Sequence, residues 1–182
     1  MEYVGLVKQV KAALEKDGAG HVPVMVDDRL DVALAAGADG LHVGDGDLEA
    51  KLARKFLPDH LILGVSLYGD LDRARALIQE SKQEGFTVDY VAGAGVASST
   101  TKAFEPKGHE SYDAFKKGLM SAGFNNPVVA IGGLDTNNTE DVVYSGADGV
   151  CFVSGLLGLP TDQVEAKARH LLDLQQRGSR DK

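Results

Sequence analysis

The sequence has a single cysteine, Cys151, and no tryptophan. One thiol excludes a disulfide framework, and because it lies in an apolar strand pattern without an obvious neighbouring base, we interpret it as a buried structural residue. No run of five or more basic residues occurs, and the net charge at pH 7 is -8. An acidic chain of this kind offers nucleic-acid phosphates nothing to bind at long range, which argues against nucleic acid as a partner.

A long hydrophobic run is also missing from the start of the chain. The first 17 residues mix charged side chains with apolar ones at helical spacing, so they match neither a signal peptide nor a membrane span. We therefore predict a soluble, cytoplasmic protein with no membrane partner. The chain has 182 residues, 43% of them hydrophobic, which suffices for one domain with a substantial core. We predict a single domain over 1–182, with a helix over 1–17 ahead of the first strand and a frayed polar tail over 177–182.

Apolar runs alternate with helical patterns along the rest of the sequence. Strands are expected at about 22–26, 40–44, 61–66, 89–95, 127–132 and 149–153. Helices are expected at about 30–36, 47–57, 70–85, 108–122 and 138–145, and from Thr161 as N-cap after Pro160. This alternation indicates right-handed crossovers and a parallel sheet. Because no dinucleotide-binding fingerprint favours an open sheet, we predict an α/β fold, a TIM-type (β/α) barrel that is incomplete, with about six of the usual eight units.

A strand-helix-strand phrase occurs twice. The first copy runs from Pro23 to Gly44 and the second from Pro127 to Gly155, and both contain the tetrapeptide Gly-Ala-Asp-Gly. We interpret the aspartates of these tetrapeptides, Asp39 and Asp148, as structural residues that accept hydrogen bonds from turn amides.

Carboxylates follow the first two strands of the chain. Asp27 and Asp28 end the first strand, and Asp45 and Asp47 follow the second. In parallel α/β folds the functional groups collect at the carboxyl ends of the strands. Magnesium takes one or two carboxylates, keeps several waters and bridges to substrate phosphates, so these loops predict a Mg²⁺ site. The alternative is that each aspartate caps the helix that follows it.

The other strand ends carry groups suited to anions. The third strand ends at Ser66. The fourth strand leads into the loop 98–102, whose serine and threonine hydroxyls and Lys102 amine would hold an anion. Glycines that end the last two strands would let backbone amides approach a phosphate, or would only turn the chain. His42 lies inside a strand, and we interpret it as a structural histidine. The candidates at these strand ends are Ser66, Ser99, Thr101, Lys102, Gly132, Gly133, Ser154 and Gly155.

From about residue 3 to 175, these motifs resemble thiamine-phosphate synthase in order and spacing. The resemblance rests on Asp27-Asp-Arg-Leu-Asp-Val-Ala-Leu, Gly37-Ala-Asp-Gly-Leu-His-Val-Gly-Asp-Gly-Asp47, Leu63-Gly-Val-Ser66, Thr101-Lys102, Ala130-Ile-Gly-Gly133 and Gly146-Ala-Asp-Gly-Val-Cys-Phe-Val-Ser-Gly155. It implies a (β/α)8 barrel and a transferase of thiamine biosynthesis. With Mg²⁺ present, such an enzyme joins hydroxymethylpyrimidine diphosphate to thiazole phosphate and releases pyrophosphate.

The resemblance also implies roles for individual residues. Asp28 and Asp47 would hold Mg²⁺, with Asp27 beside them at the substrate. Ser66 and Lys102 would be catalytic, and together with Ser99 and Thr101 they would face the pyrophosphate. Gly132, Gly133, Ser154 and Gly155 would hold the thiazole phosphate. The implied mechanism is dissociative, so pyrophosphate leaves before the thiazole nitrogen captures the pyrimidine carbocation.

The sequence departs from this family on the pyrophosphate side. The family's Gln-x-Arg-x-Lys motif is absent, and Asp27 and Asp45 replace an asparagine and a glutamine. A phosphate-binding remnant or regulator without catalysis is therefore an alternative. A second alternative is the related thiazole tautomerase, although Leu67-Tyr68 stands where that enzyme has its histidine. Unpaired sheet edges would also allow homo-oligomers to form.

Overall fold

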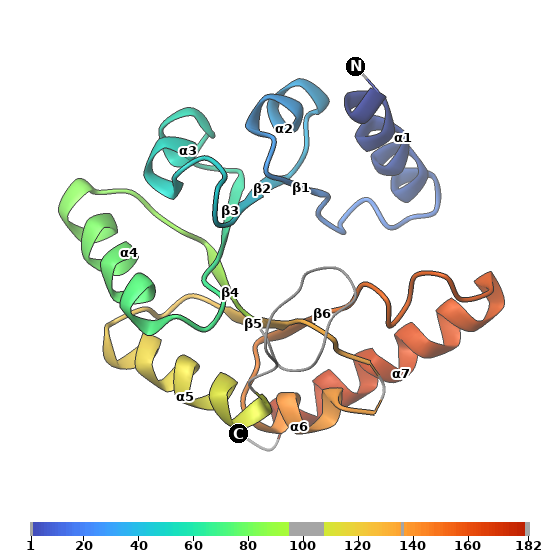
Figure 1. Cartoon of the computed structure of the whole chain (residues 1–182). Coiled ribbons are helices and arrows are strands. Elements are labelled where there is room, and N and C mark those ends of the chain that lie inside the picture. Colours follow the sequence, from blue (N-terminus) through green and yellow to red (C-terminus); the bar gives the residue numbers. More distant parts are fainter. Residues whose placement is uncertain (1, 95–107, 136, 181–182) are drawn as a thin grey trace. The chain divides into compact units, whose positions relative to one another are not determined.

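The computed structural model describes residues 2–94, 108–135 and 137–180, in which helices and strands alternate (Figure 1). The helices are α1 (Glu2–Lys16), α2 (Leu30–Ala36), α3 (Ala50–Phe56), α4 (Leu71–Glu84), α5 (Gly108–Ser121), α6 (Thr139–Tyr144) and α7 (Thr161–Arg180). The strands are β1 (Met25–Asp27), β2 (Gly40–Val43), β3 (Ile62–Ser66), β4 (Tyr90–Ala94), β5 (Val128–Ile131) and β6 (Gly149–Cys151). Six strands are thus present in the described residues, as predicted.

The chain packs as two compact units. Unit 1 spans Met1–Ser66 and Gln79–Tyr90, and unit 2 spans Leu67–Ile78 and Val91–Lys182. The expectation of a single domain over 1–182 stays a prediction. Within the residues that the structure describes, no helix is both long and apolar enough to cross a membrane.

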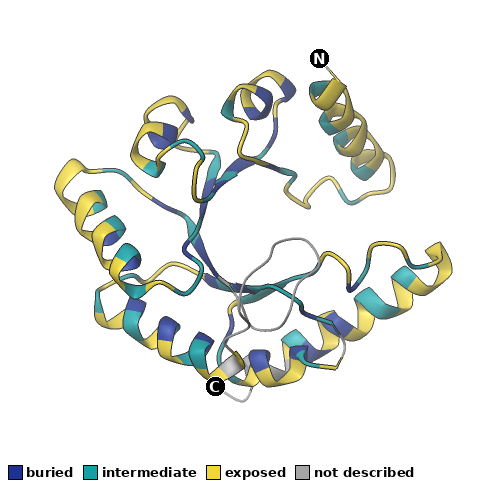
Figure 2. Cartoon of the chain, viewed as in Figure 1, coloured by how far each residue is buried: buried dark blue, intermediate teal, exposed yellow. Residues whose placement is uncertain are grey.

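In unit 1, the strands β1, β2 and β3 pair in parallel. Side chains alternate between the two faces of a strand, and Leu41, Val43 and Leu63 on one face are buried. The opposite face carries His42, which pairs in register with Gly64 of β3. Figure 2 shows dark blue buried residues along these strands and yellow exposed residues on the outer sides of the helices. The apolar face therefore forms the core of this unit, and the opposite face carries the polar side chain of His42.

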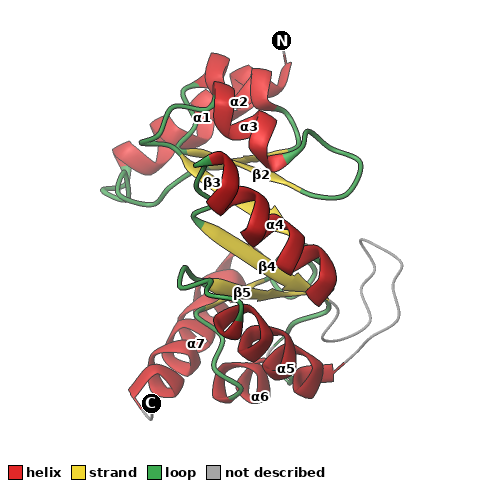
Figure 3. Cartoon of the chain, turned by 90° about the vertical axis from the view of Figure 1, so that its left-hand side faces the viewer, coloured by secondary structure: helices red, strands yellow, loops and turns green. Residues whose placement is uncertain are grey.

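In unit 2, the strands β4, β5 and β6 also pair in parallel. The helices α5, α6 and α7 lie beside these strands (Figure 3). A side chain at Gly93 of β4 would come within 2.8 Å of the Phe115 ring, so glycine at this position lets α5 pack closely on the sheet. The buried Tyr112 donates a 2.6 Å hydrogen bond to the Val128 carbonyl, and burial raises the pKa of its hydroxyl well above the ordinary value.

Two aspartates of the repeated tetrapeptide have the predicted structural role. The Asp39 carboxylate accepts from the Val24 amide at 2.7 Å, and the Asp39 amide donates to the Val24 carbonyl at 2.9 Å. Asp148 binds Val128 in the same way, at 2.9 Å and 3.1 Å. Each aspartate therefore fixes the start of one strand against the start of the next, an arrangement that we call an aspartate clamp.

A third aspartate clamp occurs outside the repeat. Asp89 accepts from the Leu63 amide at 2.7 Å and donates to the Leu63 carbonyl at 2.9 Å. Each clamp also includes a cation from a helix. The pairs are Lys11 of α1 with Asp39 at 2.6 Å, Arg54 of α3 with Asp89 at 2.6 Å and Lys116 of α5 with Asp148 at 2.7 Å.

Some boundaries differ from those expected. The strand β1 begins at Met25 instead of about 22, because Pro23 has no amide hydrogen to give to a ladder. The carbonyl of Pro160 accepts from the Val164 amide at 3.2 Å, so Pro160 takes the N-cap position that we predicted for Thr161. The helix α7 continues to Arg180 and so includes 177–180, and the expected fraying of the tail over 177–182 stays a prediction. Its one glycine there costs about 1 kcal/mol of helix propensity, which does not end the helix. Cys151 is half-buried instead of fully buried.

Candidate functional site

The carboxyl end of β1 is a tight turn around Asp28. The Arg29 amide donates to the Asp27 carbonyl at 2.7 Å, and Asp28 between them has a φ of 64°. Few residues other than glycine adopt a positive φ, and aspartate is among those that tolerate it best. The Asp28 amide donates to the His42 carbonyl at 2.8 Å, which ties the turn to β2. Backbone strain of this kind, of order 1–3 kcal/mol, is concentrated at functional sites.

Arg29 follows this turn, and its charge is shared with a neighbour. Its guanidinium binds Asp31 through two hydrogen bonds of 2.8 Å and 2.6 Å. The hydrogen bond from Arg29 is the main reason that the pKa of Asp31 is lowered to about 2. Both side chains are exposed, so the pair neutralises surface charge beside the candidate carboxylates.

The carboxyl end of β2 is a turn closed by Asp47. One oxygen of this half-buried aspartate accepts from the Gly44 amide at 2.8 Å. The helices that follow β1 and β2 begin with Arg29 and Glu49 as N-caps, and neither has a side-chain cap hydrogen bond. The N-cap positions themselves are therefore occupied by residues other than Asp28 and Asp47.

The carboxylates of these two turns fit a magnesium ion in chemistry and number. Within residues 2–94, 108–135 and 137–180, no three or more His, Cys, Asp or Glu side chains are grouped as a metal cage. Mg²⁺ does not need such a cage, because one or two carboxylates, waters and substrate phosphates complete its shell. Asp28 and Asp47 carry carboxylate oxygens, the hard ligand type that Mg²⁺ prefers, in the turns that follow two neighbouring strands.

Ser66, at the carboxyl end of β3, belongs to a row of hydrogen-bonded side chains. Its Oγ lies 2.8 Å from His42 Nε2, and His42 Nδ1 lies 2.8 Å from the Tyr90 hydroxyl. The rings of His42 and Tyr90 are stacked, with centroids 5.4 Å apart. We predicted Ser66 from its place at a strand end, but the sequence reasoning missed Tyr90 and the contact of His42. The available signal was alternation, which puts His42 and Ser66 on the same face of adjacent strands.

The other candidates on the pyrophosphate side are not described by the structure. Ser99, Thr101 and Lys102 were predicted to contact this part of the substrate, and all three lie outside the described residues. Their roles therefore rest on the sequence alone.

In unit 2, the glycines after β5 form a turn with an unusual backbone. Gly132 and Gly133 have φ angles of 108° and 63°, which residues with a side chain rarely adopt. Asn138 holds the loop, because its Nδ2 donates to the Gly133 carbonyl and its Oδ1 accepts from the Asp135 amide, both at 2.9 Å. The sequence reasoning did not single out Asn138.

The loop after β6 lies against this glycine turn. A Cβ added at Gly155 would come within 2.7 Å of the Leu134 carbonyl oxygen, so the backbones of the two loops are in close contact. Ser154 precedes Gly155 and is exposed. The structure thus brings the loops of Gly132, Gly133, Ser154 and Gly155 together at the carboxyl ends of β5 and β6.

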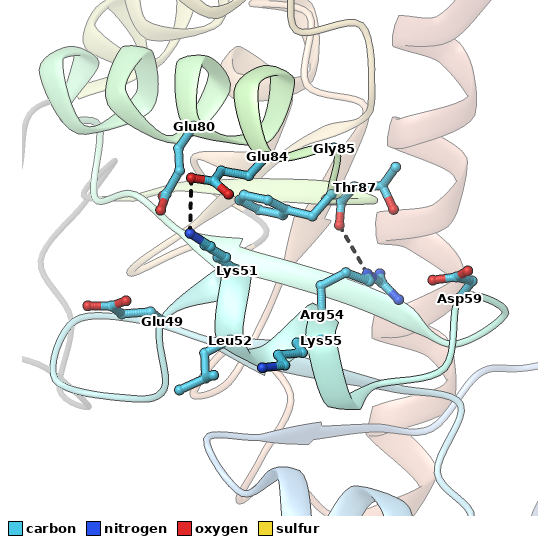
Figure 4. Close-up of a pocket in the computed structure, with 11 residues that line it drawn as sticks. Glu49, Lys51, Leu52, Arg54, Lys55, Asp59, Glu80, Glu84, Gly85 and Thr87 are labelled. Atoms are coloured by element: carbon cyan, nitrogen blue, oxygen red, sulfur yellow. Dashed lines mark hydrogen bonds and ion pairs between the residues drawn. The ribbon is translucent and has the colours of Figure 1, made fainter.

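A groove in unit 1 lies away from these candidate residues. It has a volume of about 860 Å³ and runs between α3 and the end of α4. Charged side chains line it, including Lys51, which pairs with Glu84 at 3.1 Å (Figure 4). Arg54 on its wall donates to the carbonyls of Leu61 and Thr87, which precede β3 and β4. The groove is therefore near the amino ends of the strands, and the candidate residues are at the carboxyl ends.

Known proteins similar to this chain agree with the sequence motifs. A family model described as thiamine monophosphate synthase matches residues 2–156. The chain is 37% identical over 175 residues to a thiamine-phosphate synthase of Moorella thermoacetica, with 95% of this chain and 75% of that protein covered. It is 33% identical over 153 residues to the thiamine-phosphate synthase of Agrobacterium fabrum, with 83% of this chain but only 66% of that protein covered.

A solved structure shows the same fold. The thiamine phosphate pyrophosphorylase from Pyrococcus furiosus matches with a TM-score of 0.77 and 27% identity, covering 97% of this chain and 77% of that chain. Together with the six parallel strands, this match confirms the predicted α/β fold, an incomplete TIM-type (β/α) barrel. The chain belongs to the thiamine monophosphate synthase family.

Proposed function

We propose that this chain is a thiamine-phosphate synthase, a transferase that couples hydroxymethylpyrimidine diphosphate with thiazole phosphate. The observation that carries the proposal is the 37% identity, over 95% of the chain, to a protein with that name. The products would be thiamine phosphate and pyrophosphate. A cytoplasmic location, association through sheet edges and the absence of nucleic-acid and membrane partners remain parts of the same proposal.

On the diphosphate side, Asp28 and Asp47 would be the magnesium ligands. Bound Mg²⁺ would stabilise the negative charge that develops on the leaving pyrophosphate. Asp27 lies beside Asp28 at the same strand end. Ser66 would donate its hydroxyl hydrogen to a diphosphate oxygen, and Ser99, Thr101 and Lys102 would add hydroxyls and a positive charge.

On the thiazole side, the two adjoining loops of unit 2 would hold the phosphate. Gly132 and Gly133 would present backbone amides, and Ser154 would add a hydroxyl donor next to Gly155. In the reaction, the bond between the pyrimidine methylene carbon and the diphosphate oxygen breaks, and its electron pair leaves with pyrophosphate. The lone pair of the thiazole nitrogen then forms the new carbon-nitrogen bond.

The test is a direct assay of the 182-residue chain. It would be incubated with both substrates and Mg²⁺, and the formation of thiamine phosphate would be followed. We expect product that disappears with a chelator and in Asp28→Ala. The matched control is Asp72→Ala, which removes a carboxylate whose side chain is 93% exposed on α4; this variant should keep full activity.

The other outcomes separate the alternative functions. Absence of product, with thiazole phosphate still bound, would contradict the synthase proposal and support a phosphate-binding protein without catalysis. The specific observation behind that alternative is that Asp27 and Asp45 stand where the family has amides and add negative charge beside a diphosphate. Metal-independent tautomerisation of a thiazole phosphate would identify the chain as a thiazole tautomerase.

A further inference from the structure

We propose that Tyr90 is a positioning residue for Ser66 and acts through His42. In this proposal, the Tyr90 hydroxyl keeps the imidazole proton of His42 on Nε2, so that Ser66 directs its own hydroxyl hydrogen toward a bound diphosphate. The inference rests on the proposed function, because it concerns the residue that would bind the diphosphate. Within unit 1, the three side chains come from β2, β3 and the first residue of β4.

The geometry that carries the inference is a continuous row of short contacts. The two hydrogen bonds of His42, to Tyr90 Oη and to Ser66 Oγ, are both 2.8 Å long. These bonds occupy both ring nitrogens of His42, and stacking on the Tyr90 ring, with 26° between the planes, fixes the orientation of the imidazole. All three residues are half-buried, so water competes less for these bonds than it would at an exposed site.

Gly64 makes this row possible. It lies on β3 close to the Tyr90 ring, and a Cβ there would be 2.2 Å from Tyr90 Cζ and 2.5 Å from Tyr90 Oη. The absence of a side chain lets the tyrosine ring pass over β3 and reach His42, which pairs in register with Gly64. The position of the Tyr90 hydroxyl is therefore fixed by the packing of the sheet.

The hydrogens in the row have two consistent arrangements. A neutral imidazole has one N–H donor and one nitrogen acceptor. If Tyr90 donates to Nδ1, then Nε2–H donates to Ser66 Oγ, and the serine hydrogen points to a third partner. If Nδ1–H donates to Tyr90 instead, Nε2 accepts the serine hydrogen, and Ser66 presents only lone pairs.

Only the first arrangement suits an anion. Diphosphate oxygens accept hydrogen bonds and have none to donate when ionised, so a serine that presents lone pairs would repel them. A Tyr90 hydroxyl that donates to Nδ1 selects the arrangement in which Ser66 is a donor. Tyr90 thereby prepares Ser66 for the substrate without touching it.

The first measurement is the tautomer of His42 in the ¹⁵N-labelled, ligand-free chain, read by NMR from the ring nitrogens. His42→Gln identifies the signals. We expect a proton on Nε2 in the wild type and a mixture of tautomers in Tyr90→Phe, which keeps the ring but lacks the hydroxyl. Tyr144→Phe removes the hydroxyl of a tyrosine that is 55% exposed on α6 and should leave the His42 signals unchanged.

The second measurement is the affinity for pyrophosphate in the presence of Mg²⁺, by calorimetry. Loss of the hydrogen bond from Tyr90 should weaken binding by about 3- to 10-fold in Tyr90→Phe. Gly64→Ala, which would displace the Tyr90 ring, should weaken binding at least as much, whereas Tyr144→Phe should bind like the wild type.

The outcomes separate this inference from the proposed function. A wild-type His42 with its proton on Nδ1, or a Tyr90→Phe variant with unchanged tautomer or unchanged pyrophosphate affinity, would overturn the inference. A wild type that does not bind pyrophosphate would contradict the diphosphate half of the proposed function. In that case the tautomer measurement alone decides whether Tyr90 controls His42.

Discussion

Asp148 binds the backbone of Val128 at two points. Its amide donates to the Val128 carbonyl at 3.1 Å, and its carboxylate accepts from the Val128 amide at 2.9 Å. The amide and carboxylate of one residue thus fix the start of β5 beside the start of β6. Clamps at Asp39 and Asp89 do the same for β1 with β2 and for β3 with the residue before β4.

Each of the three clamps includes its own cationic side chain, and these side chains differ in how deeply they are buried. The side chains of Lys11 and Lys116 are 28% and 15% exposed, whereas that of Arg54 is only 5% exposed. Arg54 also donates to the carbonyls of Pro58 and Leu61 at 3.2 Å and 2.9 Å. It therefore serves the backbone of the loop before β3 as well as the carboxylate of Asp89.

Replacing Arg54 should be the most destabilising change among the clamps. We expect Arg54→Met to lower the free energy of unfolding by about 2–4 kcal/mol, because the carbonyls of Pro58, Leu61 and Thr87 lose the donor that the buried guanidinium provides and Asp89 loses its charge partner. Urea denaturation followed by circular dichroism measures this. The matched control is Lys51→Met, which breaks an exposed pair with Glu84 and should change stability by less than about 1 kcal/mol. Equal effects of both variants would contradict the role given to burial.

Asp39 should make the stability of the chain depend on acidic pH. Burial alone would raise its pKa, but hydrogen bonds from Lys11 and from the Val24 amide outweigh burial and lower the pKa below the ordinary 3.8. The ionised carboxylate therefore stabilises the folded chain above the unfolded pKa. This stability is lost as the pH falls below about 4 toward the folded pKa.

Asp39→Asn tests this dependence. The amide still accepts from Val24 but does not attract Lys11, so we expect a loss of about 1 kcal/mol at pH 7 and a flatter pH profile below pH 4. Thermal unfolding at a series of pH values measures both. Asp72→Asn, at an exposed position of α4, should follow the wild-type profile. A mutant curve parallel to that of the wild type below pH 4 would show that Asp39 does not titrate as described.

Most of the fold was predictable because the strands of a parallel sheet are recognisable in the sequence as continuous apolar runs. A strand covered on both faces is apolar throughout, as in Leu61-Ile-Leu-Gly-Val, and this run became β3. The start of α3 was placed too early, at about 47. The Asp47 carboxylate binds the Gly44 amide and closes a turn, so the helix begins only at Ala50.

The site was less predictable, because the rule that functional groups collect at the carboxyl ends of strands considers no other positions. That rule selected Ser66, but it passes over Tyr90, which begins β4. The tyrosine reaches the site because its side chain is long and Gly64 leaves the path open. The third aspartate clamp was missed for another reason. Asp89 follows Val88 instead of the Gly-Ala pair that marks the other two clamps.

Gly155 should be required for the contact between the two loops of unit 2. We expect Gly155→Ala to lower the free energy of unfolding by about 1–3 kcal/mol, since a Cβ would lie 2.7 Å from the backbone oxygen of Leu134. Affinity for thiazole phosphate should fall as well, which titration calorimetry measures. Gly5→Ala on α1, where nothing lies within 4 Å of the added atom, should instead stabilise the chain by up to about 1 kcal/mol. Wild-type affinity in Gly155→Ala would exclude this loop from the phosphate site.

Replacing Asp28 with glycine should raise the stability of the chain and abolish its metal-dependent activity. An L-residue in the left-handed region costs roughly 1–2 kcal/mol, and Asp28 has a φ of 64°. Asp28→Gly relieves this strain, although glycine gains entropy in the unfolded chain, so a net stabilisation of about 0.5–1 kcal/mol is expected. The same variant removes a proposed magnesium ligand and should abolish metal-dependent product formation. Thermal unfolding and the coupling assay, run on one preparation, measure the two effects.

Asp28→Asn separates strain from charge, because asparagine tolerates the left-handed region as well as aspartate does. It should keep the stability of the wild type and lose the metal-dependent activity. If Asp28→Gly is both less stable and inactive, the turn is set by contacts of the Asp28 side chain and carries no releasable strain. If both variants keep full activity, Asp28 is not a magnesium ligand, and Asp47 would have to hold the ion without it. The strain at Asp28 therefore has a functional reason only if one variant, Asp28→Gly, both stabilises the fold and abolishes the reaction.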